Sequence, residues 1–302
     1  MNEEKKIDKI FSLEETISFG DTKEKLEIEL NGSYIELKLG LEFREKIGEG
    51  GFGDVWRGYL VGREYNKEVA IKVSKRSKKS LDSLRKEVYI SGQLKHDDIG
   101  EILLYEENEG TGLIIMDYIL GKDLSKIVKW HEKLGLHFPQ KFSAFVGWIC
   151  CEILKYTHSA RVYDNNGKEV IGVLHRDITP GNIIINNFGY TKLVDFGLGI
   201  TLSELDDTIG KIAGKIGFMA PEIFVGKMDK RIDIYSLGAV MDYLIRGRNP
   251  VLDQIKESPI KLGDILKYKI KKLREEVFGV DEQLLKIIEK ATMTDKEERY
   301  NN

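Results

Sequence analysis

The sequence predicts an α+β fold with a small β-rich lobe followed by a larger, mainly helical lobe. Over residues 41–74 apolar residues alternate with polar ones and glycines, which is typical of strands, and residues 112–119 have the pattern of a buried strand. Residues 79–95 have the spacing of one helix within this first part. Beyond Lys122 helical spacing dominates, over residues 142–157, 233–246, 260–276 and 281–292. Because no repeat or flexible linker separates the two lobes, we expect them to form one unit.

Composition favours a globular domain without a nucleic-acid partner. The chain has 302 residues, 32% of them charged, and its 47 basic residues nearly balance 50 acidic ones to leave a net charge of −3. Its longest apolar runs fall short of the roughly 18 residues that a membrane span needs. The start of the chain carries charges of both signs and no apolar core of signal-peptide length. We therefore expect no membrane segment and a cytoplasmic location.

Two adjacent cysteines, Cys150 and Cys151, lie on an apolar stretch with helical spacing. Their adjacency disfavours both an ordinary disulfide and a metal site. We expect both side chains to be buried by packing.

Residues 1–40 are expected to form an extension ahead of the main domain. Apolar and polar residues alternate over residues 25–38 around Asn31-Gly32, a pair that readily adopts the positive φ angles of a tight turn. This pattern predicts a β-hairpin. Residues 1–24 are polar with mixed charge, compatible with a loose arm or a short helix, and we assign them no function.

A glycine-rich segment, Gly48-Glu49-Gly50-Gly51-Phe52-Gly53, follows a strand that ends at Ile47. Glycines allow a tight turn whose backbone amides approach phosphates without an intervening Cβ. A Rossmann turn would need a helix next, whereas residues 55–60 have the pattern of a returning strand. The segment fits a plain hairpin or, better, a strand-loop-strand cover over phosphates. Lys72 ends the next apolar run, and taken alone it would be an exposed lysine at a strand end.

The most specific motif is His175-Arg176-Asp177-Ile178-Thr179-Pro180-Gly181-Asn182, followed thirteen residues after Asn182 by Asp195-Phe196-Gly197. Here the sequence resembles the protein kinase family, whose catalytic loop has the pattern HRDxxxxN and whose metal-binding loop is DFG. The resemblance is to the eukaryotic-like, Hanks-type branch. It implies a bilobal protein kinase fold over residues 41–302, with the N-lobe at 41–116, the hinge at 117–121 and the C-lobe at 122–302, the last helix being truncated.

The resemblance implies a phosphotransferase that uses ATP and Mg²⁺, with Mn²⁺ as a possible substitute. Asp177 would be the catalytic carboxylate, which orients the acceptor hydroxyl and takes its proton late. Lys72 would hold the α- and β-phosphates, and Glu87 would pair with Lys72 to fix its position. Asn182 and Asp195 would bind the metal. The residues implied to contact ATP are Ile47, Gly48, Glu49, Gly50, Gly51, Phe52, Gly53, Val55, Ala70, Lys72, Met116, Asp117, Ile119, Asp123 and Ile184.

Further motifs follow in the order that the family has them. Residues 114–121 resemble the hinge, where Met116 would guard the back pocket and Asp123 would lie near the ribose. Ala220-Pro221-Glu222 resembles the end of the activation segment, and Arg299 the buried arginine that pairs with this glutamate. Residues 233–238 resemble the helix that anchors the catalytic loop. Agreement of so many motifs in one order disfavours any other fold.

One departure concerns the catalytic loop itself. Many serine/threonine kinases carry lysine two residues after the catalytic aspartate, where it touches the transferring phosphate, whereas this chain has Thr179. Pro180 replaces the alanine-arginine pattern common in tyrosine kinases, which favours serine/threonine specificity. The inserted residues between Tyr156 and His175, together with Thr179, resemble bacterial kinases, so we expect a bacterial or archaeal source.

A second departure is Lys215, which stands where the family usually has a threonine that contacts the catalytic aspartate and the substrate. Its ammonium could reach Asp177 and partly replace the charge missing at Thr179, or it could block the acceptor. Arg176 is typical of kinases activated by phosphorylation of the activation loop. Lys211 occupies the customary phosphosite, which leaves Thr201, Ser203 and Thr208 as candidates, or activation without phosphate.

A third departure is Ser91, four residues after Glu87, where a large apolar residue usually stacks against Phe196. Loose packing there would favour an inactive resting state, unless the N-terminal hairpin supplies support; the alternative for this hairpin is an inert cap.

Three functions remain open at this point. The first is a protein serine/threonine kinase, with autophosphorylation included, acting on a protein substrate. The second is a pseudokinase that binds nucleotide and regulates a partner, suggested by Lys215 and Thr179 and opposed by intact Lys72, Asp177, Asn182 and Asp195. The third is a phosphotransferase for small molecules, although those enzymes generally lack the Ala-Pro-Glu motif and so complete a glycine-rich loop. The sequence leaves the oligomeric state open.

Overall fold

A computed structural model describes residues 26–30, 33–37, 40–51, 53–62, 66–108, 111–136, 138–164, 166–205, 212–249, 277 and 279–301. The chain divides into two compact units. Residues 1–88 and 102–118 belong to the first unit, and residues 89–101 and 119–302 to the second. The β-rich first unit and the mainly helical second unit confirm the predicted fold class.

The first unit is built on a five-stranded antiparallel sheet with the strand order β3-β4-β5-β7-β6. The strands are β3 (Gly40–Glu49), β4 (Gly53–Val61), β5 (Asn66–Ser74), β6 (Ile102–Asn108) and β7 (Thr111–Asp117). Apolar side chains that alternate along these strands form a small core of Trp56, Val69, Ile71, Leu113 and Ile115.

One helix, α2 (Lys78–Ser91), accompanies this sheet. A Cβ on Gly112 of β7 would lie 2.9 Å from Leu81 Cδ1 and 3.3 Å from Leu84 Cδ2, so the glycine permits close packing of the helix on the strand. We expected a helix over residues 79–95, but α2 ends at Ser91. Gly92 follows, and the amides of Gln93 and Leu94 bond to carbonyls three residues back, as in a turn.

The N-terminal extension contains the expected hairpin. β1 (Leu26–Leu30) pairs antiparallel with β2 (Ser33–Leu37), with Ile28 opposite Ile35, in a separate two-stranded sheet. The turn residues Asn31 and Gly32 and the segment 1–24 lie outside the described residues.

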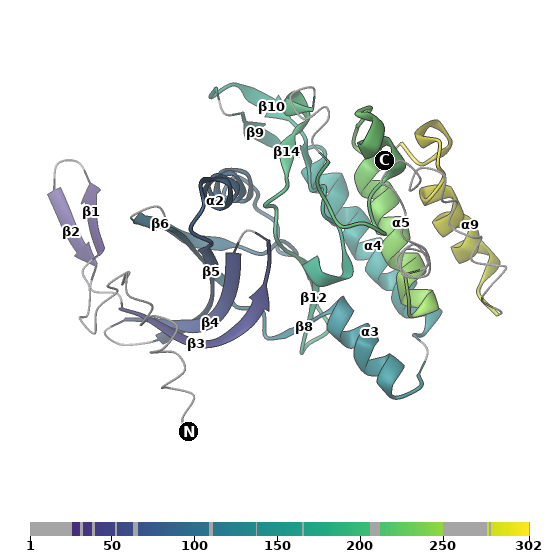
Figure 1. Cartoon of the computed structure of the whole chain (residues 1–302), viewed down its shortest axis with the longest axis horizontal. Helices are drawn as coiled ribbons and strands as arrows, with labels where there is room; N and C mark the ends of the chain where they lie inside the picture. Colours follow the sequence, from purple (N-terminus) through teal and green to yellow (C-terminus); the bar gives the residue numbers. More distant parts are fainter. Residues whose placement is uncertain are drawn as a thin grey trace. The chain divides into compact units, whose positions relative to one another are not determined.

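The second unit is dominated by α3 (Leu124–Lys133), α4 (Gln140–Thr157), α5 (Arg231–Arg246) and α9 (Glu282–Ala291). α4, α5 and α9 lie side by side (Figure 1). A Cβ on Gly147 of α4 would lie 2.6 Å from the sulfur of Met241 on α5, so glycine allows this close approach. The expected helices at 142–157, 233–246 and 281–292 are thus present with bounds shifted by one or two residues, while 260–276 lies outside the described residues.

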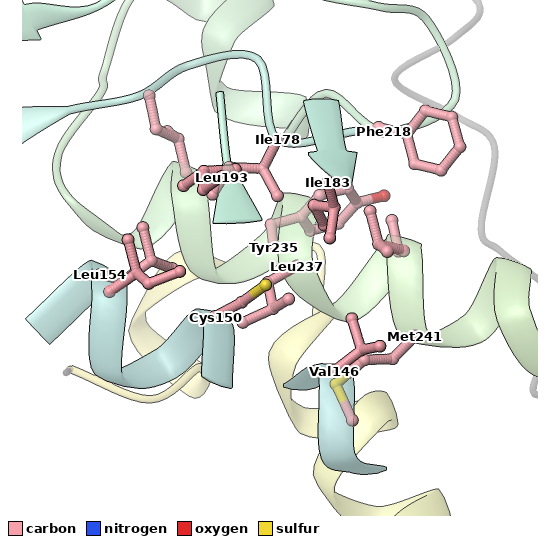
Figure 2. Close-up of a cluster of buried hydrophobic side chains, with 14 of the residues drawn as sticks. Val146, Cys150, Leu154, Ile178, Ile183, Leu193, Phe218, Tyr235, Leu237 and Met241 are labelled. Carbon is pink, nitrogen blue, oxygen red and sulfur yellow. The ribbon is translucent and has the colours of Figure 1, made fainter. Parts of the chain in front are cut away.

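A large apolar core joins these helices to the loops that carry the polar motifs. Side chains from α4, α5 and the strands between them converge in it (Figure 2). Cys150 is fully buried here, but Cys151 is exposed, so the expectation that both are buried is wrong for Cys151. Consecutive residues on a helix project roughly 100° apart, and only one of the two can face the core. Within the described residues no helix is both long and apolar enough to cross a membrane.

Short strands frame the polar loops of the second unit. β8 (Gly121–Asp123), β12 (Ile183–Asn186) and β13 (Thr191–Leu193) form a three-stranded sheet with β12 in the middle. β11 (Val173–Leu174) pairs antiparallel with β14 (Ile200–Thr201). An additional hairpin pairs β9 (Arg161–Tyr163) with β10 (Glu169–Ile171).

Candidate active site

The glycine-rich segment of the first unit is a tight turn between two antiparallel strands. β3 ends at Glu49, and the Gly50 amide donates a hydrogen bond of 2.8 Å to the Gly53 carbonyl oxygen. A Cβ on Gly53 would lie 2.3 Å from the carbonyl oxygen of Val73, so glycine is required at the start of β4. A strand therefore follows the turn, not the helix of a dinucleotide-binding turn. Phe52 lies outside the described residues.

Lys72 and Glu87 form a buried ion pair in the first unit. Nζ of Lys72 on β5 lies 2.6 Å from Oε2 of Glu87 on α2, and the two residues are 8% and 4% exposed. Removing two such charges from water is costly, and their mutual attraction offsets part of that cost. The alternative of an exposed lysine at a strand end is wrong, and the expected pairing is present.

The central strands of the sheet bring several implied nucleotide contacts together. Val55 on β4 lies opposite Lys72 on β5, and Ala70 on β5 lies opposite Met116 on β7. Ala70 is buried between neighbouring strands. Direct contact of these residues with ATP remains a prediction, as it does for the residues at the ends of β3 and β7, which are Ile47, Gly48, Glu49 and Asp117.

Asp123, which we expected near a ribose, caps helix α3. Its carboxylate accepts hydrogen bonds from the Ser125 hydroxyl and the Lys126 amide, the latter at 3.0 Å, and lies 2.9 Å from Lys126 Nζ. Burial opposes ionisation, but these contacts outweigh it and lower the pKa of Asp123. Asp123 also lies opposite Ile184 in the sheet of β8 and β12. The carboxylate is thus held charged at the helix N-terminus, where negative charge is favourable.

The catalytic-loop motif is held from behind by Asp233 on α5. The fully buried carboxylate accepts hydrogen bonds from the amides of His175 and Arg176, each at 2.9 Å, and from Nε2 of His158, also at 2.9 Å. Burial acts to raise the pKa of Asp233, but the donors outweigh it and lower the pKa. Arg176 has a φ of 65°, which is unusual for a residue with a side chain. The hydrogen bonds from the His175 and Arg176 amides to Asp233 hold the backbone in this conformation.

Sequence reasoning did not single out His158. A histidine that follows an amphipathic helix has no distinctive pattern, and its contact with Asp233 joins residues 75 positions apart.

Asp177 is oriented by its own loop. Nδ2 of Asn182 donates to the Asp177 carbonyl oxygen at 2.8 Å and to its carboxylate Oδ2 at 3.0 Å. The Asp177 amide donates to Nδ1 of His175 at 3.2 Å, so the other ring nitrogen, Nε2, carries the proton and donates to the Val194 carbonyl oxygen. The carboxylate therefore has a fixed direction on a fixed loop.

Two carboxylates of the second unit influence each other. Burial raises the pKa of Asp177 and the charge of Asp195 raises it further, whereas His175, Asn182 and Lys215 lower it. Asp195 has a φ of 67°, and its Oδ1 accepts a bond of 3.2 Å from the Gly197 amide. Neighbouring negative charges in a partly buried place favour a cation.

Asn182 and Asp195 fit a magnesium ion chemically. Both side chains offer hard oxygen atoms. In Asn182 the amide nitrogen Nδ2 donates a hydrogen bond to Asp177, and the amide oxygen Oδ1 is the atom suited to a metal. Among the described residues no cluster of three or more His, Cys, Asp or Glu side chains could hold a metal ion. A two-ligand set agrees with Mg²⁺, which usually keeps waters and phosphate oxygens as its other ligands.

Lys215 lies beside the catalytic loop. Its Nζ is 3.6 Å from the point that a Cβ on Gly181 would occupy, and Oγ1 of Thr179 is 3.8 Å from the same point. The ammonium also lowers the pKa of Asp177, as noted above. Both expectations for Lys215, charge replacement and obstruction of the acceptor, stay predictions.

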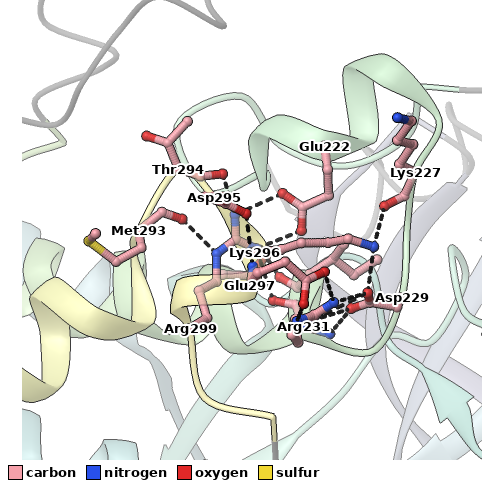
Figure 3. A network of polar contacts seen from close by, with 12 residues as sticks. Glu222, Lys227, Asp229, Arg231, Met293, Thr294, Asp295, Lys296, Glu297 and Arg299 are labelled. Atoms are coloured by element: carbon pink, nitrogen blue, oxygen red, sulfur yellow. Dashed lines mark hydrogen bonds and ion pairs between the residues drawn. The ribbon is translucent and has the colours of Figure 1, made fainter.

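Glu222, in the Ala-Pro-Glu motif, forms an ion pair with Arg299. The guanidinium of Arg299 donates to both carboxylate oxygens of Glu222, from Nη1 at 2.5 Å and from Nη2 at 2.8 Å (Figure 3). Both side chains are buried, and the Arg299 guanidinium also lies over the ring of Tyr235. The expected pairing of Arg299 with Glu222 is present.

A second ionic cluster adjoins this pair. Arg231 donates to the carboxylates of Asp229 and Glu297, and Nζ of Lys296 lies 2.6 Å from Oδ2 of Asp229 (Figure 3). Burial acts to raise the pKa of Asp229, but the bonds from Arg231 and Lys296 outweigh it and lower the pKa strongly.

The additional hairpin supports the end of α2 and the turn that follows. The Tyr89 hydroxyl donates to the Asp164 carbonyl oxygen. The Gln93 side chain accepts from the Tyr163 amide at 2.7 Å and donates to the Tyr163 carbonyl oxygen at 3.3 Å. Ser91 itself is buried. Sequence reasoning looked to the N-terminal hairpin for support near Ser91, whereas these bonds come from β9 and the residue after it.

The candidate phosphosites differ in access. Thr201 is 1% exposed, and its hydroxyl and amide both bond to Oε2 of Glu204 in a capping box. Ser203 is exposed. Thr208 and Lys211 lie outside the described residues. Of the described candidates, Ser203 is therefore the accessible one.

Comparisons with known proteins agree with this geometry. The family described as "Protein kinase domain" matches residues 41–302. An L-type lectin-domain containing receptor kinase, SIT2, of Oryza sativa subsp. japonica is 29% identical over 74% of this chain and 32% of its own length. The tyrosine-protein kinase MasK of Myxococcus xanthus is 28% identical over 84% and 40%. A probable serine/threonine-protein kinase of Corynebacterium efficiens is 30% identical over 69% and 31%.

A two-unit fold with a Lys72–Glu87 pair and a catalytic loop that carries Asp177 and Asn182 defines a kinase-type phosphotransferase domain. The chain belongs to the protein kinase family, of the Hanks type. It spans about a third of the length of the curated relatives with which it was compared. These relatives come from plants and bacteria and carry names of different specificity.

Proposed function

We propose that this chain is an ATP- and magnesium-dependent protein kinase that phosphorylates serine or threonine hydroxyls, including its own. The observation that carries the proposal is the fixed carboxylate of Asp177, oriented by Asn182 on a loop that Asp233 holds in place. A carboxylate with a set direction can align a hydroxyl, which is most of what a protein contributes to phosphoryl transfer.

In the proposed reaction the acceptor hydroxyl oxygen forms a bond to the γ-phosphorus of ATP. The bond from that phosphorus to the β–γ bridging oxygen breaks, and its electron pair leaves with ADP. Asp177 accepts a hydrogen bond from the hydroxyl and then its proton. Burial raises the pKa of Asp177, which makes it a better proton acceptor late in the reaction.

The other polar residues position and neutralise charge. Lys72, kept in place by Glu87, is proposed to hold the α- and β-phosphates. Asn182 and Asp195 would hold Mg²⁺, which when bound neutralises phosphate charge. Asp177, Asn182 and Asp195 belong to the second unit and Lys72 to the first.

Serine/threonine preference rests on Pro180 in the catalytic loop and on the Corynebacterium efficiens relative. The likeness to MasK, named a tyrosine-protein kinase, points the other way. Phosphoamino-acid analysis of the product separates the two. Phosphotyrosine as the main product would contradict the serine/threonine assignment.

The central experiment is incubation with γ-labelled ATP and Mg²⁺, with and without a generic protein substrate, beside the Asp177→Asn variant. We expect phosphoryl transfer by the wild type and none by Asp177→Asn. The ATP affinities of the two proteins should differ by less than about threefold. Wild-type turnover in Asp177→Asn would refute the role of this carboxylate. ATP binding without transfer by the wild type would instead favour a pseudokinase, for which the neutral Thr179 and the nearby Lys215 are the supporting observations.

A further inference from the structure

The catalytic loop lacks a positive charge at the position where many members of the family have one. Thr179 stands there, 1% exposed, and its Oγ1 has no hydrogen-bond partner among the described residues. A buried neutral hydroxyl cannot offset the charge of a transferring phosphoryl group. If the chain is a kinase, another group has to supply that charge.

Lys215 approaches the same place from a different segment. As measured above, its Nζ and Oγ1 of Thr179 border one point, the position of a Cβ on Gly181. This point carries no atom because residue 181 is glycine. A larger side chain there would occupy the space next to the ammonium.

Gly181 matters here because it has no side chain, and not because of its backbone freedom. Its φ lies outside the left-handed region that favours glycine, so the conformation does not require this residue. The absent side chain instead leaves room beside Lys215. The neutral residue at 179, the small residue at 181 and the lysine at 215 form one arrangement.

We propose that Lys215 supplies, from the segment before Ala220-Pro221-Glu222, the positive charge that the catalytic loop lacks at Thr179, and that Gly181 leaves space for its ammonium. The proposal rests on the proposed kinase function and assigns a further catalytic residue to it. The Lys215 ammonium stabilises negative charge on the transferring phosphoryl group; the bonds that form and break are those given above.

Electrostatics supports this geometry. The Lys215 ammonium is close enough for its charge to act on the Asp177 carboxylate. An ammonium near enough to influence the catalytic carboxylate is near enough to influence the group transferred beside it.

Obstruction of the acceptor is the competing role for Lys215, and the two roles predict opposite changes. Removal of an obstruction raises turnover, whereas removal of a required charge lowers it. Lys215→Ala is expected to lower kcat about 100-fold, with the KM for ATP changed less than about threefold. Lys215→Arg should retain part of the activity. Lys141→Ala, which removes an exposed lysine of α4, is the matched control.

Relocation of the charge gives a sharper test. In Thr179→Lys/Lys215→Thr the lysine stands where the family usually has it, and we expect kcat at least about tenfold above that of Lys215→Thr alone. Gly181→Leu should lower kcat because the side chain displaces the ammonium, and it should cost little more in a Lys215→Ala background. Gly181→Ala, whose Cβ makes only ordinary contacts, is the size control.

A binding measurement separates failure of this proposal from failure of the kinase function. Calorimetry with ADP, Mg²⁺ and aluminium fluoride, which mimics the transferring group, should show at least about tenfold weaker binding to Lys215→Ala, with binding of ADP and Mg²⁺ unchanged. A wild type that transfers phosphate while Lys215→Ala and Lys215→Thr match or exceed it overturns the role of Lys215. A wild type that neither transfers phosphate nor prefers the mimic over ADP overturns the kinase function, and the role of Lys215 with it.

Discussion

Gln93 and Tyr163 form a two-way bridge in which the Gln93 amide side chain takes the place of a neighbouring strand. Oε1 accepts from the Tyr163 amide at 2.7 Å, and Nε2 donates to the Tyr163 carbonyl oxygen at 3.3 Å. Nε2 also donates to the carbonyl oxygen of Tyr89 at 2.8 Å. One side chain thus joins the turn after α2 to an edge of the β9–β10 hairpin.

The first prediction follows from this bridge. Gln93→Leu removes both partners of the Tyr163 backbone, and because water can reach this edge the loss should be about 1 kcal/mol in the free energy of unfolding. Urea denaturation measures the loss, and hydrogen exchange should show a faster Tyr163 amide. Gln283→Leu, on the exposed face of α9, is the control. Unchanged exchange at Tyr163 would rule out the bridge.

The second prediction separates stability from activity at the Lys72–Glu87 pair. Glu87→Ala removes the carboxylate that lies 2.6 Å from the buried Lys72 ammonium and should cost about 3 kcal/mol in unfolding free energy. Replacement of both charges, in Lys72→Met/Glu87→Leu, should recover most of that stability because neither charge remains buried.

Phosphoryl transfer should be absent in the double variant, because Lys72, the proposed contact to the phosphates, has been replaced. Thermal unfolding and the γ-labelled ATP assay give the two readouts. Recovery of transfer together with stability would contradict the role of Lys72.

The third prediction concerns the metal. Asp195→Ala should weaken binding of ATP with Mg²⁺ by at least about tenfold, because one of two proposed oxygen ligands is lost. Binding of ATP in the presence of a chelator should be nearly the same for the variant and the wild type. Calorimetry under both conditions tests this, and an equal loss with and without Mg²⁺ would show that Asp195 does not act through the metal.

The fourth prediction is a pH dependence at the cluster of Asp229, Arg231 and Lys296. The folded-state pKa of Asp229 is lowered below its unfolded value, so its contribution to stability is present above the unfolded pKa of about 3.9 and is lost as the pH falls through the folded pKa. Because the carboxylate is partly exposed, Asp229→Asn should cost only about 1 kcal/mol at pH 7.

That cost should shrink as the pH falls below about 4, because the unfolded wild type begins to bind a proton at Asp229 there while the folded protein still keeps the carboxylate charged. Unfolding curves at pH 7 and at a pH below about 4 measure the cost of Asp229→Asn. Asp97→Asn, which changes an exposed aspartate, is the control. A cost for Asp229→Asn that is independent of pH would indicate a role other than charge.

The fold class and the order of the motifs could be predicted because both depend on patterns within short contiguous segments of the sequence. Strand and helix periods gave the two units, and the match of residues 41–302 to the protein kinase domain confirms the family. Lys72 and Glu87 lie fifteen positions apart, and only the family pattern singled out that glutamate. The burial of Cys151 was predicted wrongly because an apolar stretch does not reveal which face of a helix meets the core.

Contacts between distant segments could not be predicted from one sequence. His158 bonds to Asp233 across 75 positions and Gln93 to Tyr163 across 70, and neither pair has a local pattern that marks it. The space that Gly181 leaves beside Lys215 is of the same kind. The family pattern singled out Lys215, whereas its proximity to Gly181 is visible only in the folded chain.

The pairing of β11 with β14 limits how the DFG loop can move. β11 leads directly into the catalytic loop and β14 follows the Asp195 loop, with Leu174 opposite Ile200. β13, on the other side of Asp195, ends at Leu193. A rearrangement of the Asp195 loop that keeps both flanking strands paired is thereby confined to residues 194–199, and a larger one would unpair β14 from the strand that leads into the Asp177 loop. A small molecule that traps a larger displacement of Asp195 would therefore have to unpair β14 from the strand that leads into the loop carrying Asp177.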